Sequence, residues 1–336
     1  MARVFHLLSS PPQSPPITST PHRTSIPTEN HTALFMPARI AHPDLRGTTM
    51  KAVCVPRNSG DTRGLPASTI VLDEDTGAVK AIVNARNLTA LRNAAGSLLS
   101  TNLVGIHAPT SITTFGAGKQ IEAHLVLHIR SFPSLTTCTL VNRSLNARVH
   151  DLRNRLAAHF PHVTFAAIAY SYSTAAKKSS QGVEVEAAVR AASLVICATS
   201  STMPLFAAAW VSPGTHVILI GSYTPAMREV ERTLVRQAVK SHGLLVDSRE
   251  ACAVEAGELI DAGVTSEEVR EIGEFVAIGE GGEVTLMPLR KAQGSNSITM
   301  FKSVGVGLQD VAIACAVVEK ADSMSFGSRI LGYDFV

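Results

Sequence analysis

The sequence predicts an α/β protein in which a doubly wound parallel sheet follows a first part built on an antiparallel sheet. From Ser111 onward, strand-like runs alternate with segments of helical periodicity, an order that is typical of parallel sheets. Before residue 84, short β-branched runs follow one another without a helical segment between them, which favours antiparallel pairing. With 336 residues, 45% of them hydrophobic and 17% charged, the chain is long and apolar enough for two such parts.

The first part begins with a segment, residues 1–20, that is rich in Ser, Thr and Pro and lacks acidic residues. This composition predicts a disordered or atypical tail; a transit peptide is the alternative, because such peptides also lack acids. Strands are then expected over residues 33–36, 50–55, 68–72 and 79–83. A helix is expected over residues 88–105, where leucines and alanines recur at helical spacing, with Asn87 as its N-cap.

In the second part, strands are expected over residues 112–115, 138–141, 194–198, 217–220 and 244–246. Helices are expected over residues 145–159, 184–192, 228–241 and 248–257. The last apolar stretch, residues 297–318, predicts a long helix that packs back against the first part. Lys302, Gln309 and Asp310 interrupt this stretch, which excludes a membrane span.

A glycine turn joins the first strand of the second part to the helix that follows it. Gly116 permits a sharp turn, and Gly118 lets the backbone approach a pyrophosphate, whose charge the free N–H groups of a helix start can hold. Ile121 occupies the third position of this fingerprint, so a slightly wider helix–strand spacing is expected there. The pattern predicts a dinucleotide-binding Rossmann unit. The alternative is a glycine turn without a ligand.

The residues at the end of the second strand predict which dinucleotide binds. Adenosine ribose recognition at this position normally uses an acid that accepts from the 2′-hydroxyl. Here Asn142, Arg143 and Ser144 offer a cation and hydrogen-bonding groups instead. Since Arg143 can pair with a 2′-phosphate, we expect NADP(H) as the cofactor. The alternative is a surface arginine at a strand end.

Hydroxyl-bearing residues follow two further strands at their carboxyl ends, where ligands bind in such sheets. Thr199 and Ser200 follow one of these strands, and Gly221 and Ser222 follow the next. Because both lie beside the glycine turn in the expected sheet, we predict that they line the cofactor cleft. Turns with capping hydroxyls are the alternative.

Two basic residues of the first part lie on apolar faces. Lys51 shares a strand face with Val53 and Val55, and Arg92 shares a helix face with Leu99. A single such cation can extend its charged end to water. Two of them ahead of a nucleotide-binding fold indicate a site for an anionic substrate, in the first place a carboxylate.

Composition excludes several classes of function. A net charge of +3 with scattered basic residues indicates no nucleic-acid partner. Five cysteines without a metal-ligand spacing predict buried thiols in a reducing, cytoplasmic compartment and no metal site. His124 and His128 share a helix face, which we interpret as an exposed face and not as a metal site.

Ten motifs occur in order along the chain: PHR (21–23), FMPAR (35–39), MKAV (50–53), LTALRNAA (88–95), FGAGKQ (115–120), VNRS (141–144), ATSS (198–201), PGTHVILIGSYTPAMRE (213–229), VDSREA (246–251) and FKSVGVGLQD (301–310). With these motifs, the chain resembles the ornithine cyclodeaminase/mu-crystallin family from about residue 21 onward. The resemblance implies a Rossmann domain, residues 109–297, inserted in a mixed α+β substrate-binding and dimerisation domain, residues 21–108 and 298–336.

The resemblance also implies the roles of individual residues. It implies that Arg23, Lys51 and Arg92 hold a substrate carboxylate beside the nicotinamide. It implies that the following residues contact the cofactor in addition to those named above: Ala117, Lys119, Gln120, Ala198 and Ser303. A homodimer acting on a small carboxylate, without a membrane partner, is the implied assembly.

The chain departs from the family pattern in two places. Tyr223 stands where true ornithine cyclodeaminases have an aspartate. The helical segment that usually precedes the PxR motif is not evident in the first twenty residues, which leaves the dimer geometry open. We therefore predict an NADP(H)-dependent reductase of cyclic ketimine carboxylates, or an amino-acid dehydrogenase, with Lys51 as the proton-transfer group. The alternatives are a cyclodeaminase-type lyase with recycled NAD(P) and a non-catalytic NADPH- or small-ligand-binding protein.

Overall fold

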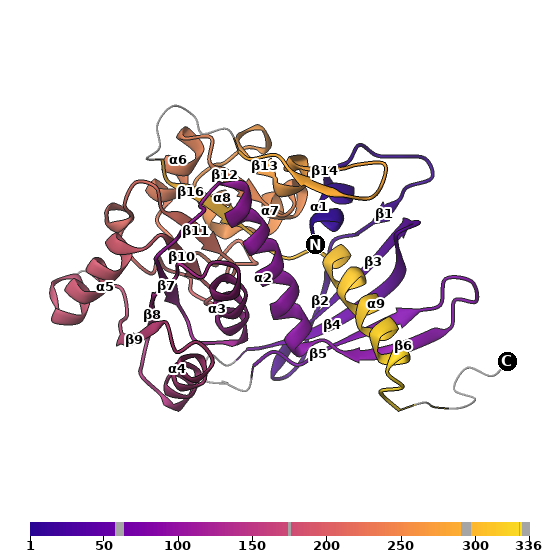
Figure 1. Ribbon diagram of the computed structural model, residues 1–336, viewed down its shortest axis with the longest axis horizontal. Coiled ribbons are helices and arrows are strands. Elements are labelled where there is room, and N and C mark those ends of the chain that lie inside the picture. The colour runs from indigo at the N-terminus through magenta and orange to yellow at the C-terminus, as the bar shows by residue number, and fades with distance from the viewer. Residues whose placement is uncertain (58–63, 174–175, 290–296, 329, 331–336) are drawn as a thin grey trace.

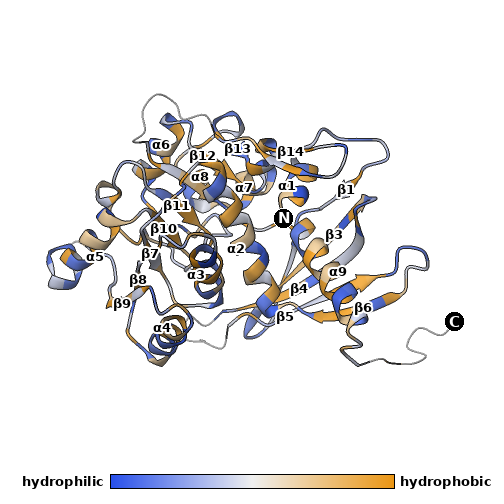
Figure 2. Cartoon of the chain, in the orientation of Figure 1, coloured by the Kyte–Doolittle hydropathy of each residue, from blue (hydrophilic) through white to orange (hydrophobic). Residues whose placement is uncertain are grey.

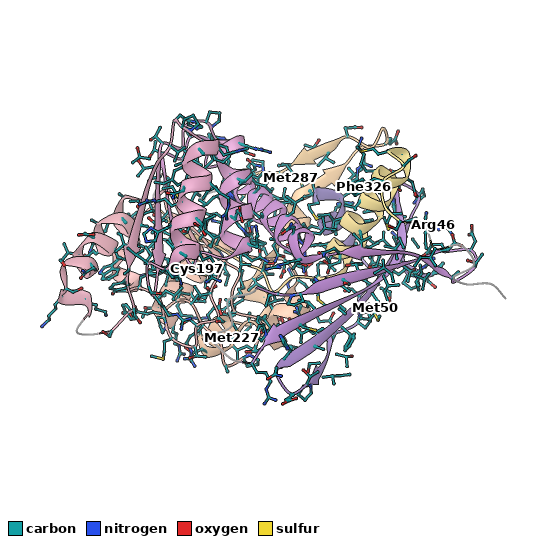
Figure 3. The ribbon with its side chains drawn as sticks, turned by 90° about the horizontal axis from the view of Figure 1, so that it is seen from below. Arg46, Met50, Cys197, Met227, Met287 and Phe326 are labelled. Atoms are coloured by element: carbon teal, nitrogen blue, oxygen red, sulfur yellow. The ribbon has the colours of Figure 1, made fainter. Side chains whose placement is uncertain are left out.

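The computed structural model describes residues 1–57, 64–173, 176–289, 297–328 and 330. An eight-stranded parallel sheet and an antiparallel sheet lie at opposite ends of the molecule, with the long helix α2 between them (Figure 1). In the view turned by 90°, Cys197 marks the parallel sheet, and Arg46 and Met50 mark the antiparallel one (Figure 3). The predicted combination of a parallel and an antiparallel part is confirmed.

The parallel sheet has the strand order β13-β12-β16-β11-β10-β7-β8-β9. Its strands are β7 (Ser111–Phe115), β8 (Thr137–Asn142), β9 (Thr164–Ala169), β10 (Leu194–Cys197), β11 (His216–Leu219), β12 (Leu244–Val246), β13 (Arg270–Glu271) and β16 (Thr299–Lys302). Both neighbours of β7 are parallel to it, and the chain leaves it first toward β8 and later toward β10. This reversal of strand order is the point at which ligands bind in doubly wound sheets.

Helices connect these strands: α3 (Lys119–Ser131), α4 (Ala147–His159), α5 (Ser180–Ala191), α6 (Arg232–Lys240), α7 (Arg249–Glu255) and α8 (Gly257–Asp261). Short 3₁₀ segments are η1 (Ala176–Lys178), η2 (Ala208–Trp210), η3 (Ser266–Glu268) and η4 (Ile272–Phe275). All residues of β10 and β11 are buried, because helices cover both faces of the sheet. Figure 2 accordingly shows these two strands as largely hydrophobic.

The expectation of one helix over residues 297–318 is wrong at its start. Thr299–Lys302 is strand β16, which pairs with β11 on one side and β12 on the other. Its short apolar run fits a buried strand as well as a helix, and only the flanking glycines distinguish the two. Gly305, with φ +80°, ends the extended segment, and helix α9 (Gly307–Ser323) follows. The end of the chain therefore contributes a strand to the parallel sheet before it returns to the first part.

The antiparallel sheet has the strand order β1-β3-β4-β5-β6, with β2 paired to β3. Its strands are β1 (Thr18–Ser19), β2 (Thr24–Pro27), β3 (His31–His42), β4 (Leu45–Pro56), β5 (Ala67–Leu72) and β6 (Val79–Asn84). Helix α9 packs on β3, β4 and β5, and helix α2 (Arg86–Leu103) packs on α3 of the other part. The N-cap of α2 is Ala85 and not the predicted Asn87, which lies within the helix.

The expectation of a disordered tail over residues 1–20 is wrong for its first half. Ala2–Ser9 forms helix α1, in which Val4 and Phe5 are 1% and 0% exposed. The helix packs on η4 and on β14 (Val276–Ile278), which forms a hairpin with β15 (Val284–Leu286). Its apolar residues recur at helical spacing, whereas the Ser and Pro residues that dominate the composition come after residue 8.

Across the part of the chain that the structure describes, no helix combines the length and the apolar character that crossing a membrane requires.

Candidate active site

The three predicted cations come together at the carboxyl end of the parallel sheet. Lys51 extends from β4, Arg92 from α2, and Arg23 from the residue before β2. The side chains of Lys51 and Arg92 are 1% and 3% exposed. Arg92 and Arg23 both lower the pKa of Lys51 by charge repulsion, which places all three within electrostatic reach of one another.

Asp310, in the first turn of α9, joins two of these cations. Its Oδ2 lies 2.7 Å from Nζ of Lys51, and its Oδ1 lies 3.3 Å from Nε of Arg92. Nη1 of Arg92 also donates to Oε1 of Gln309 at 2.5 Å. The sequence shows Asp310 as an acid in an apolar stretch, but not which cation it meets. The carboxylate neutralises one of two buried positive charges and fixes both side chains.

The surroundings of Lys51 lower its pKa to about 7. Burial is the largest cause and the charge of Arg92 the next, while Asp310 opposes both by its charge and its hydrogen bond. An amine with this pKa can hold or release a proton near neutral pH, as proton transfer requires.

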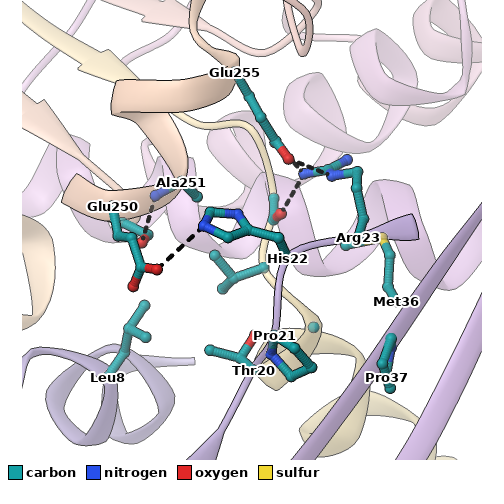
Figure 4. Close-up of a pocket in the computed structure, with 14 residues that line it drawn as sticks. Leu8, Thr20, Pro21, His22, Arg23, Met36, Pro37, Glu250, Ala251 and Glu255 are labelled. Atoms are coloured by element: carbon teal, nitrogen blue, oxygen red, sulfur yellow. Dashed lines mark hydrogen bonds and ion pairs between the residues drawn. The ribbon is translucent and has the colours of Figure 1, made fainter. Parts of the chain in front are cut away.

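Arg23 is held by the parallel-sheet part of the molecule. Its Nε donates to Oε1 of Glu255 at 2.8 Å, and its Nη2 donates to the carbonyls of Val304 and Gly305, both at 3.0 Å. A cavity of about 50 Å³ lies beside this arginine, between α1, β3 and α7 (Figure 4). His22, also at this cavity, pairs with Glu250 at 3.1 Å.

Gly305 brings the backbone after β16 against the cations. A Cβ at this glycine would lie 2.5 Å from Nη1 of Arg92, so a side chain there would displace the guanidinium. The buried carboxylate of Asp247 holds the loop, because Oδ2 accepts from the N–H of Gly305 at 2.7 Å and from the hydroxyl of Ser303 at 2.6 Å. The hydroxyl of Ser303, a predicted cofactor contact, is thus already bonded within the protein.

Tyr223 follows β11 and lies within electrostatic reach of Arg23. It is half-buried and packs against Leu34, Val53, Ala67 and Ala85. Burial raises the pKa of the phenol, and the charge of Arg23 partly offsets that rise. The position that holds an acid in true cyclodeaminases therefore carries a neutral group near Arg23.

The glycine turn fits a dinucleotide pyrophosphate. Gly116 has φ +108°, and a Cβ there would lie 2.8 Å from the carbonyl oxygen of Ala198. Gly118 is the N-cap of α3, and a Cβ there would meet no atom within 4 Å, so the space before the helix start is open. Ile121 is fully buried beneath the turn. Among the described residues, the buried Oε1 of Gln120 also has no hydrogen-bond partner.

The loop after β8 presents the predicted cation to solvent. Nδ2 of Asn142 donates to the carbonyl of Ser144 at 2.8 Å, which closes the turn. Arg143 and Ser144 are exposed at its tip. The arrangement leaves Arg143 accessible to an anion, whereas Asn142 acts within the loop.

The loops after β10 and β11 meet each other beside the glycine turn. A Cβ at Gly221 would lie 1.9 Å from the carbonyl oxygen of Thr199, so the two loops touch. The hydroxyl of Ser222 is fully buried and donates to the carbonyl of Met227, so it is already bonded within the protein. Among the predicted contacts in these loops, Ser222 can offer a ligand only its backbone, while Ser200 is exposed.

The interpretation of His124 and His128 as an exposed face is wrong. Both rings are 0% exposed between α3 and α2, where Nε2 of His124 contacts the hydroxyl of Ser97 at 2.9 Å and Nε2 of His128 contacts that of Thr101 at 3.1 Å. Burial lowers their pKa values to about 3 and about 4. The polar partners on α2 explain why a core position tolerates imidazoles.

Fold and site together define a Rossmann-type protein that has a glycine turn typical of dinucleotide binding and a buried cluster of cations. The family model of the ornithine cyclodeaminase/mu-crystallin family matches residues 12–325, and the chain belongs to this family. Ketimine reductase mu-crystallin of Mus musculus is 27% identical over 305 residues, 90% of this chain and 85% of that protein. Delta(1)-pyrroline-2-carboxylate reductase of Colwellia psychrerythraea is 30% identical over 260 residues, 77% of this chain and 75% of that protein.

A solved structure has the same fold over nearly the whole chain. It is the Delta(1)-pyrroline-2-carboxylate reductase of Thermococcus litoralis in complex with NADH and L-proline. It aligns with a TM-score of 0.79 at 22% identity, covering 98% of this chain and 93% of that one.

Proposed function

We propose that this protein reduces cyclic ketimine carboxylates with a nicotinamide dinucleotide as hydride donor. The observation that carries the proposal is the cation cluster beside the glycine turn. When Lys51 is protonated, three cations, Arg23, Lys51 and Arg92, face the carboxylates of Asp310 and Glu255, which leaves one positive charge in excess. A substrate monocarboxylate balances that charge in a buried site, where an unpaired charge is costly. The relatives named ketimine reductase and pyrroline-2-carboxylate reductase agree with this substrate class.

Each residue has a distinct part in the proposed reaction. When bound, the nicotinamide supplies the hydride that the imine carbon accepts. The guanidinium of Arg92, held in place by Asp310 and Gln309, would bind the substrate carboxylate, and Arg23, anchored to the carbonyls of Val304 and Gly305, can contribute a second donor. Lys51 supplies or holds the proton on the imine nitrogen, because its lowered pKa keeps both protonation states accessible near pH 7. Burial of the cluster excludes water from the reacting carbon.

The turn from Gly116 through Ala117, Gly118, Lys119 and Gln120 would hold the pyrophosphate of the cofactor. Exposure of Arg143 supports our proposal that NADP(H) is preferred over NAD(H), since a guanidinium at that place can pair with the 2′-phosphate. A homodimer and a cytoplasmic location remain predictions from the sequence.

The direct test is cofactor oxidation with purified protein. NADPH and NADH are offered with five- and six-membered cyclic imino acids, and with α-keto acids plus ammonia or methylamine. We expect turnover with a cyclic imino acid and the faster rate with NADPH. If NADPH binds but no imine or keto acid with amine is reduced, the reductase proposal is wrong, and a cyclodeaminase-type lyase or a binding protein takes its place.

A further inference from the structure

Three loops at the carboxyl edge of the parallel sheet touch one another in a row. The turn after β7 meets the loop after β10, because a Cβ at Gly116 would lie 2.8 Å from the Ala198 carbonyl oxygen and 3.5 Å from Cγ2 of Thr199. The loop after β10 in turn meets the loop after β11, where a Cβ at Gly221 would overlap the backbone of Thr199. The loop after β10, which we call the middle loop, therefore contacts both the turn after β7 and the loop after β11.

One buried carboxylate fastens the middle loop to the loop after β11. Oε1 of Glu229 accepts from the N–H of Thr199 at 2.7 Å and from its hydroxyl at 2.8 Å. Oε2 of Glu229 accepts from the N–H of Gly221 at 2.8 Å. The side chain is 0% exposed, so these three donors and the surrounding charges replace its hydration.

We propose that Glu229 is a positioning residue for the nicotinamide cofactor: its carboxylate holds the loops after β10 and β11 in the arrangement that the cofactor requires. The inference rests on the proposed function, because it assumes that a nicotinamide dinucleotide lies against these loops. Glu229 itself has no surface accessible to solvent, so we assign it no direct contact with the cofactor.

The geometry requires a carboxylate at this position. Both oxygens act as acceptors, and the donors approach from two different loops. An amide has one acceptor oxygen and an NH₂ group, so glutamine would direct a donor at the N–H of either Thr199 or Gly221. Aspartate is one methylene shorter and cannot span the same two loops. Protonation of Glu229 has an effect similar to that of the amide, because the added hydrogen faces a donor.

Several charged groups influence the ionisation of Glu229. Burial raises its pKa to about 7, and Glu258 of α8 adds to the rise. Lys302 of β16 and the bonds from Thr199 favour the ionised form, and the Cys197 thiol of β10 also lies within electrostatic reach. Lys302 is itself tied to Glu258 at 3.1 Å, which limits the compensation that it gives to Glu229.

The test compares Glu229→Gln with Glu231→Gln in the full-length protein. Glu231 lies two residues further on and accepts from the hydroxyl of Tyr172 and from the N–H of Ala208, so its carboxylate bonds neither Thr199 nor Gly221. We expect Glu229→Gln to weaken binding of NADPH and of NAD⁺ at least about tenfold, as loss of a hydrogen bond to a charged acceptor does. Glu231→Gln should bind both as the wild type does. At saturating cofactor, the KM for the imine should change less than about threefold, since Arg92 and Lys51 are not altered.

A pH series separates positioning from general stability. The affinity of the wild type for NAD⁺, which has no 2′-phosphate to titrate, should fall below about pH 7. Glu229→Gln should show a weaker dependence, the remainder of which comes from Lys51, whose pKa is also about 7. Should Glu229→Gln fail to fold, Thr199→Val removes a single donor and should still weaken binding about threefold. Unchanged NADPH affinity in a folded Glu229→Gln or Thr199→Val protein would overturn the inference. Wild-type protein that binds neither dinucleotide would instead refute the proposed function, and this inference with it.

Discussion

The ammonium nitrogen of Lys51 lies 2.7 Å from Oδ2 of Asp310, with both side chains nearly inaccessible to solvent. The pair links strand β4 of the antiparallel sheet to the first turn of α9, directly after the strand that the end of the chain adds to the parallel sheet. Because Asp310 also contacts Arg92, the charge on Lys51 depends on one carboxylate, one guanidinium and the extent of burial. A change in any of these three influences therefore moves the pKa of Lys51 within the neutral pH range.

We predict that kcat/KM for imine reduction falls above about pH 7. Burial lowers the pKa of Lys51 from 10.5 to about 7, so the amine is protonated and able to donate below that pH and neutral above it. A bound substrate carboxylate adds negative charge, so kcat should decline at a higher pH than kcat/KM. Asp310→Asn removes the group that raises the pKa and should move the decline to lower pH. Rate profiles of both proteins measure this, and identical profiles would exclude Lys51 as the titrating group.

Arg92→Lys should raise the KM for the imine by at least about tenfold while the affinity for NADPH stays the same. Lysine keeps the charge but lacks the planar set of donors with which arginine can contact Asp310, Gln309 and a substrate carboxylate at the same time. Arg92→Ala should have a larger effect, because it also leaves Asp310 with one cation instead of two. Steady-state kinetics and direct cofactor titration give the two quantities separately. Equal losses of substrate and cofactor binding would make Arg92 a structural residue.

Much of this site could be predicted from the sequence, but the interactions between its parts could not. Lys51 and Arg92 are evident because a cation on an apolar face disturbs a local periodicity. Asp310 and Glu229 are acids whose partners lie far away along the chain or in another loop, and no local pattern reveals such partners. Strand β16 is not predictable from its sequence, because a short buried run fits a helix and a strand equally well. Helix α1 is hidden in the composition of residues 1–20, because the apolar residues of the first half are outnumbered by the Ser, Thr and Pro residues that follow.

Acidification should destabilise the protein through its buried imidazoles. The pKa of His128 is about 4 in the folded state against an ordinary value of 6.5, so the unfolded chain binds the additional proton between these values. The free energy of unfolding should therefore fall by about 1.4 kcal/mol per pH unit for this residue as pH decreases from 6.5 toward 4. His128→Gln should reduce the slope by that amount, and the exposed His162→Gln should not. Urea unfolding between pH 7 and pH 5 measures the slopes; equal slopes in all three proteins would contradict the prediction.

Arg143→Ala should weaken the binding of NADPH far more than that of NADH. A charge-assisted bond to the 2′-phosphate contributes about 1.5–3 kcal/mol, which is at least about a tenfold change, and NADH has no such phosphate. Arg153→Ala, in the middle of α4, is the matched control and should leave both affinities unchanged. Fluorescence titration with the two cofactors provides the comparison. If Arg143→Ala weakens both equally, the preference for NADP(H) has another origin.

The last prediction is that the protein releases no ammonia from ornithine. Deaminative cyclisation requires a group that takes a proton from the attacking amine near neutral pH and holds that amine at the imine carbon. A carboxylate does both, whereas the phenol of Tyr223 is neutral, and burial raises its pKa above the ordinary value of 10. Reduction of a cyclic imine demands less, because its nitrogen is already part of the ring. Purified protein should therefore oxidise NADPH with a cyclic imino acid and form neither proline nor ammonia from ornithine.

Tyr223→Asp places a carboxylate close to Arg23, and we expect it to gain measurable ornithine turnover with a lower rate of imine reduction. Proline and ammonia formed by the wild type at a rate comparable to imine reduction would show that the family's lyase chemistry does not depend on that acid.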